Sequence, residues 1–220
     1  MSDSSDLSPS ARLRARLLEA FPPHAARLGW NRAALKAAAE TAGLSEGEAA
    51  LACPSGALDL CDAFAARADR AMAEAVARLD LANMRVRERV KAAVQARIEA
   101  QAPYKQAAGA MSRALIAPPR AGVAARLLWR SADRIWRALG DTSTDENFYS
   151  KRAILAGVLA STYARWFADD SETGAETWAF LDARIENVMQ FEKFKARLKP
   201  LSEGVREAVA AAARFRYGGH

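Results

Sequence analysis

Side chains able to bind a metal or act as a nucleophile are scarce in this sequence. The 220 residues include two Cys and two His, whereas a structural zinc site normally takes four such ligands. Cys53 and Cys61 stand in no reactive motif, so we expect reduced thiols that pack in the interior. A hydrolase built on Ser161 or Cys61 would need a base paired with the nucleophile, and the sequence offers no convincing pair. We therefore expect no metal, no cofactor and no catalytic residues, in a protein that is not an enzyme.

The composition favours a single all-α body. Hydrophobic residues make up 51% of the chain, and 53 residues are Ala, the best helix former. A length of 220 residues fits one hydrophobic core, because chains usually divide into domains above roughly 250 residues. The formal net charge of +6 suits an anionic membrane surface, a nucleic acid or simple solubility, and it does not choose among them.

The ends and the apolar stretches predict a cytoplasmic protein. The first ten residues carry two Asp and no basic residue, unlike a secretory or transit peptide. The longest uncharged apolar stretch, Ala153 to Ala164, has 12 residues, short of the roughly 20 that cross a bilayer as a helix.

Apolar residues recur at helical spacing between Gly and Pro stops, which predicts nine or ten helices. The first begins at Ser8-Pro9 and is expected to end near Phe21, because Pro22-Pro23 should stop it and leave His24 in a loop. Asn31 caps the second helix, and Ser45 with Glu48 forms a capping box for the third. Longer helices are expected at 56–79, 84–101, 104–117, 120–139, 145–168, 173–199 and 201–217. This division gives a three-helix lobe over 1–54, a helical body over 55–199 and a C-terminal helix over 200–220.

The N-terminal lobe resembles the helix-turn-helix lobe of TetR-type repressors. The resemblance lies in Leu17 to Phe21 followed by Leu35 to Ser45. A recognition helix needs cations and hydrogen-bonding side chains against DNA, yet here it carries Glu46 and Glu48 and no Arg, Asn or Gln. We expect a degenerate lobe that binds no nucleic acid, and we keep a TetR-type ligand-responsive transcriptional regulator as the alternative.

The segment from Gly140 to Arg152, GDTSTDENFYSKR, is polar and aromatic in an alanine-rich chain. One interpretation is a loop and a helix start, with Ser143 as the cap and acidic residues in the first turn. The segment also looks like the signature of the coenzyme Q nine family of ubiquinone biosynthesis accessory proteins. Two other blocks, Arg85 to Glu99 and Thr177 to Met189, are similar to further helices of that family, and the resemblance runs over roughly residues 10 to 200.

The resemblance implies a TetR/FadR-like all-α fold, often dimeric, that has given up DNA binding and holds a lipid pocket. It implies a protein that binds a polyprenylated quinone precursor, or a phospholipid, at the membrane. It further implies that the precursor is presented to the demethoxyubiquinone hydroxylase, which does the chemistry.

Apolar stripes on three of the predicted helices supply candidate pocket residues, and each stripe is equally what a packed core requires. These residues are Leu128, Ile135, Leu139, Ile154, Leu155, Val158, Thr162, Trp178, Leu181 and Ile185. The resemblance further implies a surface that docks the hydroxylase, formed by Asp145, Phe148, Tyr149, Lys151 and Arg152. Phe148 stands where the family commonly has Trp, so the indole N–H donor is missing here.

The C-terminal segment predicts an amphipathic helix with a basic character. Residues 190 to 217 hold seven basic and three acidic side chains, a net charge of +4. Such a helix is typical of the membrane interface, so we expect weak, peripheral attachment to the inner face of a membrane. The alternative is a last helix that packs on the body or on a second subunit. The candidate membrane residues are Leu201, Val205, Arg206, Val209 and Phe215.

Overall fold

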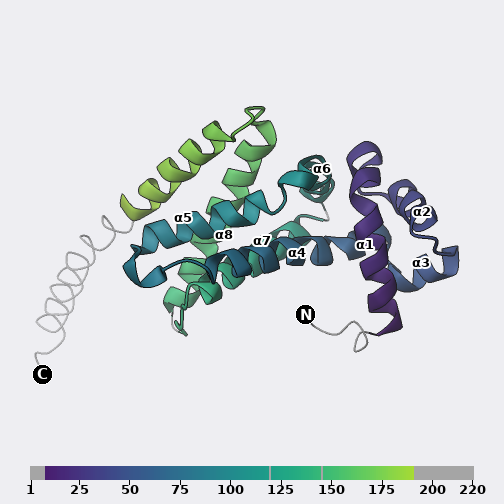
Figure 1. Ribbon diagram of the computed structural model, residues 1–220, viewed down its shortest axis with the longest axis horizontal. Coiled ribbons are helices and arrows are strands. Elements are labelled where there is room, and N and C mark those ends of the chain that lie inside the picture. Colours follow the sequence, from purple (N-terminus) through teal and green to yellow (C-terminus); the bar gives the residue numbers. More distant parts are fainter. Residues whose placement is uncertain (1–7, 119, 145, 191–220) are drawn as a thin grey trace, which may run out of the picture.

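The structure is a computed structural model that describes residues 8–118, 120–144 and 146–190 (Figure 1). Its described part is all-α, which confirms the predicted fold class. The helices are α1 (Pro9–Leu28), α2 (Arg32–Thr41), α3 (Glu46–Ala52), α4 (Asp59–Val76), α5 (Val86–Glu99), α6 (Lys105–Ile116), α7 (Ala121–Ala138) and α8 (Glu146–Ala168), followed by a last described helical segment, 175–190.

Helix α1 is longer than the sequence predicts. Ser8 caps it as expected, but the helix continues through Pro22 and Pro23 to Leu28, so the prediction that the prolines end it was wrong. Two prolines cost the helix backbone hydrogen bonds, yet Phe21 and Pro22 lie on its buried face. Burial of this face against the rest of the molecule outweighs the local preference. The helix instead ends at Gly29, whose φ of 81° is a conformation that glycine adopts readily.

The rest of the N-terminal lobe forms as its capping residues predict. The Asn31 side chain accepts a hydrogen bond from the Ala34 amide, which starts α2. The capping box that opens α3 is complete, because Ser45 and Glu48 each bond the other's backbone amide. Helix α1 packs on both short helices, and the three gather at one end of the molecule (Figure 1).

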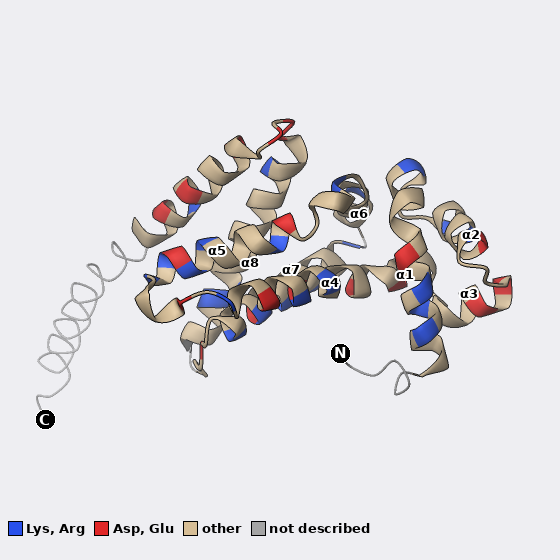
Figure 2. Ribbon diagram, in the orientation of Figure 1, with Lys and Arg blue, Asp and Glu red and all other residues tan. Residues whose placement is uncertain are grey.

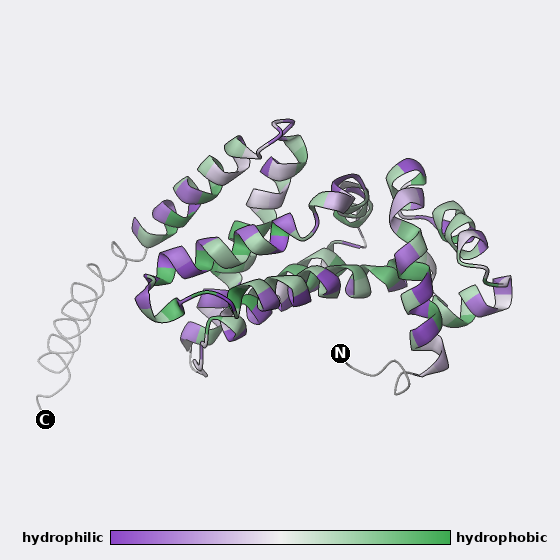
Figure 3. Ribbon diagram, in the orientation of Figure 1, coloured by the Kyte–Doolittle hydropathy of each residue, from purple (hydrophilic) through white to green (hydrophobic). Residues whose placement is uncertain are grey.

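The body is built from α4 to α8. Helix α4 packs against α5 and α7, and α7 packs against α8, while α6 bridges the body and α1. Hydrophilic and hydrophobic residues alternate along these helices, as they do in amphipathic helices that share a core (Figure 3). One continuous core runs from the lobe through the body and includes Phe21, Trp30, Phe64 and Ile135.

Among the described residues, no single helix is long and apolar enough to cross a bilayer, although α3 and residues 56–76 reach that length and composition as a pair bent by 47°. The predicted C-terminal membrane helix, with Leu201, Val205, Arg206, Val209 and Phe215, lies outside the described residues.

Candidate functional site

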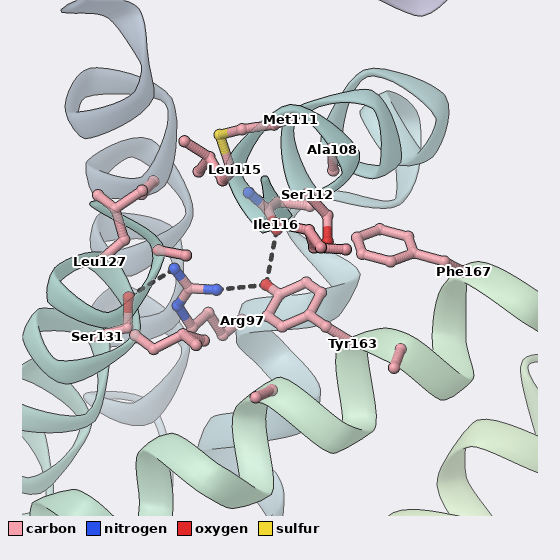
Figure 4. Close-up of a pocket in the computed structure, with 16 residues that line it drawn as sticks. Arg97, Ala108, Met111, Ser112, Leu115, Ile116, Leu127, Ser131, Tyr163 and Phe167 are labelled. Carbon is pink, nitrogen blue, oxygen red and sulfur yellow. Dashed lines mark hydrogen bonds between the residues drawn. The ribbon is translucent and has the colours of Figure 1, made fainter. Parts of the chain in front are cut away.

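A cavity of about 300 Å³ lies between α6, α7 and α8 (Figure 4). Ligand pockets in proteins usually measure roughly 300 to 1,000 Å³, so this cavity can hold a small molecule or one end of a long one. Most of the lining is apolar. The lining residues are Ala65, Arg97, Gln101, Ala108, Met111, Ser112, Leu115, Ile116, Ala124, Leu127, Leu128, Ser131, Ala160, Tyr163, Ala164 and Phe167.

Four polar side chains gather at one end of this cavity, and we name them the polar cluster: Arg97, Gln101, Ser131 and Tyr163. Arg97 donates from Nη2 to Ser131 Oγ at 2.6 Å and from Nη1 to the Tyr163 hydroxyl (Figure 4). Tyr163 donates in turn to Gln101 Oε1 at 2.6 Å. Arg97 and Gln101 are each 4% exposed, so the cluster is deep in the body. Outside this cluster the lining residues are apolar except Ser112, which lies beside Ile116 and Phe167 (Figure 4).

Arg97 is paired from behind the cavity. Its Nε donates to Asp69 Oδ1 at 2.7 Å, and Asp69, itself buried, does not line the cavity. Burial favours the neutral form of Arg97, but Tyr163 and Asp69 outweigh it and raise the pKa of Arg97. Burial also favours the neutral form of Tyr163, and for a phenol this raises the pKa, so Tyr163 keeps its proton at neutral pH.

The other end of the cavity is mostly apolar and reaches the surface. Ile116, at the end of α6, lines the cavity and is 71% exposed, an unusual position for a large apolar side chain. Leu128 and Phe167 are half-buried beside the same space. An opening of this kind admits an apolar chain.

The residues predicted to bind lipid differ in where the structure places them. Leu128 lines the cavity, while the other nine are absent from its lining. Five of these nine are buried in packed interior: Ile135, Leu155, Val158, Thr162 and Leu181. The remaining four are partly buried: Leu139, Ile154, Trp178 and Ile185.

Sequence reasoning missed the polar cluster, although one signal for it was available. Val94, Arg97, Ile98 and Gln101 share one face of α5 and its end, at helical spacing. A cation and an amide on an otherwise apolar face indicate buried hydrogen bonding. The sequence gives no such signal for Tyr163 and Ser131, because their shared partner Arg97 is 66 and 34 residues away from them.

The signature segment folds around a buried arginine. Arg152 is 1% exposed, donates from Nε to Asp133 Oδ1 at 2.8 Å and from Nη1 to Asp141 Oδ2 at 3.0 Å, and stacks on the Phe148 ring. Lys151 donates to the other oxygen of Asp141 at 2.7 Å. The hydrogen bond from Lys151, with others from Ser143 and Arg152, outweighs burial and holds the pKa of Asp141 well below its usual range. These contacts fasten the loop before α8 to α7.

The residues predicted to dock a partner differ in exposure. Tyr149 is 64% exposed, and its ring lies edge to face with that of Phe148 at 5.1 Å. Phe148 and Lys151 are partly buried, and Arg152 is buried. Asp145 lies outside the described residues. Tyr149 is therefore the most accessible of the four described side chains.

A second carboxylate that collects several hydrogen bonds, Asp169, lies just before the last described helical segment. The sequence did not predict this arrangement. Asp169 accepts hydrogen bonds from the Ser171 amide and hydroxyl and from the Thr177 amide and hydroxyl. The hydrogen bonds from the two hydroxyls are the main reason that the pKa of Asp169 lies well below its usual range. The segment consequently begins at 175, two residues later than predicted.

In the N-terminal lobe, α1 is basic and α3 is acidic (Figure 2). Two cations of α1 contact the ends of the short helices: Arg14 donates to the Ala52 carbonyl at 2.9 Å, and Arg16 donates to the Ala42 carbonyl at 2.6 Å. Cations stabilise helix C-termini, where backbone carbonyls lack partners. Glu48 stays ionised at neutral pH, because the Ser45 amide lowers its pKa.

The cysteine thiols are buried and carry no reactive environment. Burial, more than any nearby charge, raises the pKa of Cys53 to about 11 and that of Cys61 to about 12. His24 lies on α1, where it bonds Thr41 Oγ1 at 2.9 Å, and not in a loop as predicted. Within the ranges that the structure describes, no cluster of His, Cys, Asp and Glu could hold a metal ion.

The arrangement of helices defines the fold class. It matches the crystal structure of a TetR transcriptional regulator from Nitrosomonas europaea ATCC 19718 with a TM-score of 0.63. The match covers 80% of this chain and 97% of the regulator at 19% sequence identity. The protein therefore has the TetR-like fold that the sequence predicts.

Sequence comparison identifies the relatives. Residues 121–192, which include the signature, match the profile of the COQ9 family. Over 92% of its length the chain is 28% identical to the mitochondrial ubiquinone biosynthesis protein COQ9 of Rattus norvegicus and 26% identical to that of Homo sapiens. Over 55% of its length it is 31% identical to the Xenopus tropicalis protein. The chain spans 65% of the rat protein and 64% of the human one. These matches confirm the predicted resemblance to the coenzyme Q nine family.

Proposed function

We propose that this protein is a lipid-binding accessory protein of ubiquinone biosynthesis that does no chemistry itself. It binds a polyprenylated quinone intermediate at a membrane and presents it to the demethoxyubiquinone hydroxylase. The observation that carries the proposal is the cavity between α6, α7 and α8, which is apolar, opens beside the exposed Ile116 and ends at the polar cluster. The similarity to ubiquinone biosynthesis proteins supports the choice of lipid.

The cavity suits one end of a long lipid better than a whole one. At about 300 Å³ it lies at the lower limit of ligand pockets, so the rest of a polyprenyl chain must extend through the mouth. An apolar chain at the mouth needs cover from water, which a bilayer supplies. The predicted amphipathic helix at residues 201–217, preceded by the cations between 193 and 199, would bring the protein to such a surface.

The docking surface is proposed to centre on Tyr149. Its exposed ring, with Phe148 beside it, supplies an aromatic anchor of the kind that dominates protein interfaces. Lys151 and Arg152 act on this surface through Asp141, which they hold in place. We include Asp145 in this docking surface. We also propose that the protein forms a homodimer.

The alternative is a TetR-type ligand-responsive regulator, which the overall fold favours. Against it, Glu46 and Glu48 stand on the helix that would enter DNA, and Arg14 and Arg16 are committed to helix ends. A gel shift with genomic fragments separates the two proposals: specific binding at physiological salt would favour the regulator.

The test of the proposed function is native mass spectrometry of the purified protein, with extraction and identification of bound lipid. We expect an isoprenoid or phospholipid to leave with the protein under conditions that preserve the fold. Protein that is folded and free of both, even after incubation with quinone-containing vesicles, would contradict the proposal.

A further inference from the structure

The polar cluster has no part in holding an apolar tail, yet it lies at the closed end of the cavity. We propose that Arg97 and Ser131, with Tyr163 holding the Arg97 guanidinium in place, recognise the head of the lipid, and that this head is neutral and carries oxygen, as a quinone, a phenol or an alcohol does. The inference rests on the proposed lipid-binding function and specifies what the cavity selects.

The cluster has hydrogen-bonding capacity facing the cavity. In the described part of the chain, the contacts of Arg97 use three of its five N–H donors. Ser131 accepts a hydrogen bond from Arg97 through its oxygen (Figure 4). Its own hydroxyl proton is therefore available to a ligand. A carbonyl or hydroxyl oxygen at this end of the cavity would meet N–H and O–H donors. A hydrocarbon there would leave the same groups buried without water, which is unfavourable.

Charge decides between a neutral head and an anionic one. Among the described residues that line the cavity Arg97 is the one cation, and Asp69 behind it already balances its charge. Arg134 also approaches Asp69, at 3.6 Å, but it is 43% exposed and lies outside the lining, so solvent screens its charge. A carboxylate or diphosphate would therefore enter as an uncompensated buried charge, which is costly.

The two ends of the cavity fix the orientation of the ligand. The polar cluster occupies the buried end, and the mostly apolar set Ile116, Leu128 and Phe167, with Ser112 beside them, lies toward the surface. The head enters first and the tail leaves along the apolar mouth. Transfer of the lipid to a partner must then break the hydrogen bonds of the cluster.

The experiment compares three probes that share one tail and differ in the head: farnesol, β-farnesene and farnesyl diphosphate. Each is titrated calorimetrically into the full chain. We expect farnesol to bind about five- to tenfold more tightly than β-farnesene, the ratio that roughly one hydrogen bond gives. Farnesyl diphosphate should bind more weakly than farnesol.

Two variants test this: Ser131→Ala removes a hydroxyl that can donate to the head, and Tyr163→Phe removes the hydroxyl that holds Arg97 and Gln101 in place. Both should reduce the preference for farnesol over β-farnesene severalfold and leave the affinity for β-farnesene unchanged. Ser161→Ala is the matched control, because Ser161 lies two residues before Tyr163 on α8 and bonds the Gly157 carbonyl, outside the cavity. Thermal unfolding identifies any variant that fails to fold, and the other variant then decides.

Equal affinities of the wild-type chain for farnesol and β-farnesene would overturn the head recognition while lipid binding stands. Tightest binding of farnesyl diphosphate would overturn the argument from charge. Failure of all three probes to bind would instead contradict the proposed function, and this inference with it.

Discussion

Arg152 differs most between its expected and its observed surroundings. Its match to the family signature predicts a side chain on a docking surface, whereas the structure places its guanidinium between Asp133 and Asp141 with 1% exposure. A sequence motif reports that a residue is required, but it does not report whether the residue touches a partner or supports one that does. Here the neighbouring Tyr149 is the exposed member.

We expect Arg152→Ala to lower the free energy of unfolding by about 3 to 5 kcal/mol, since it leaves two carboxylates without their buried cation. The matched control is Arg137→Ala, which removes a 66% exposed partner of the same Asp133 and should cost at most about 1 kcal/mol. Urea denaturation of both variants measures the difference. Equal losses would contradict the structural role given to Arg152.

Asp141 predicts an acid dependence of stability. Its folded-state pKa lies below the unfolded value of about 4, so its contribution is present above pH 4 and is lost as pH falls toward the folded value. Asp141→Asn should therefore be less stable than wild type at pH 7, and the gap should narrow below pH 4. Denaturation curves between pH 3 and pH 7 test this, and a gap independent of pH would refute it.

The aromatic pair predicts a separable loss of binding. Replacing both Phe148 and Tyr149 with Ala should abolish capture of the demethoxyubiquinone hydroxylase, because it removes the aromatic anchor of the proposed surface. The circular dichroism spectrum should remain helical, since Tyr149 is exposed and Phe148 is only partly buried. A double variant that retains both its fold and its hydroxylase binding would refute the assignment.

At the scale of elements, local signals predicted most helix starts and missed what packing decides. Asn31, Ser45 and Glu48 fixed the beginnings of α2 and α3, because capping is a contact between residues close in sequence. The continuation of α1 through Pro22 and Pro23 depends on burial of Phe21 and Pro22, and burial is set by distant helices. The polar cluster was missed for the same reason: α5, α7 and α8 each supply part of it.

The cavity makes a prediction for α7. Ala124 lines the cavity, and its neighbour Ala125 is exposed on the same helix. Ala124→Trp should fill the space and reduce co-purified lipid at least about tenfold, while stability stays the same or rises because a void is removed. Ala125→Trp is the matched control and should retain its lipid. Quantitative lipid extraction compares the two, and equal lipid content would show that this cavity is not the binding site.

At the scale of the whole molecule, the distribution of charge says more than its sum. The sequence has a net charge of +6, yet residues 29–48 carry a net −1 and residues 190–217 a net +4. The structure adds that Arg14 and Arg16 are used within the lobe. The all-α TetR-like fold was predictable, because alanine content, capping residues and apolar periodicity agree along most of the chain.

Removal of residues 200–220 should weaken membrane attachment. The truncation removes the predicted apolar face of the helix, which is the main expected loss, together with three basic and two acidic side chains, while the four cations between 193 and 199 remain. Flotation with vesicles containing anionic lipid should therefore recover the full chain and only a small fraction of the truncated one. Equal flotation would favour a last helix that packs on the body or on a second subunit.

The junction between the N-terminal lobe and the body links the first helices to the cavity. Trp30, in the turn between α1 and α2, packs edge to face against Phe21 and Phe64, and its indole N–H donates to the Ala107 carbonyl at 2.8 Å. Ala107 stands next to Ala108, which lines the cavity. Loss of the first helices would remove Phe21 and Trp30 from the packing that supports the cavity wall. The N-terminal lobe and the cavity therefore share one packed junction, so a change that loosens the lobe should also reach the cavity wall.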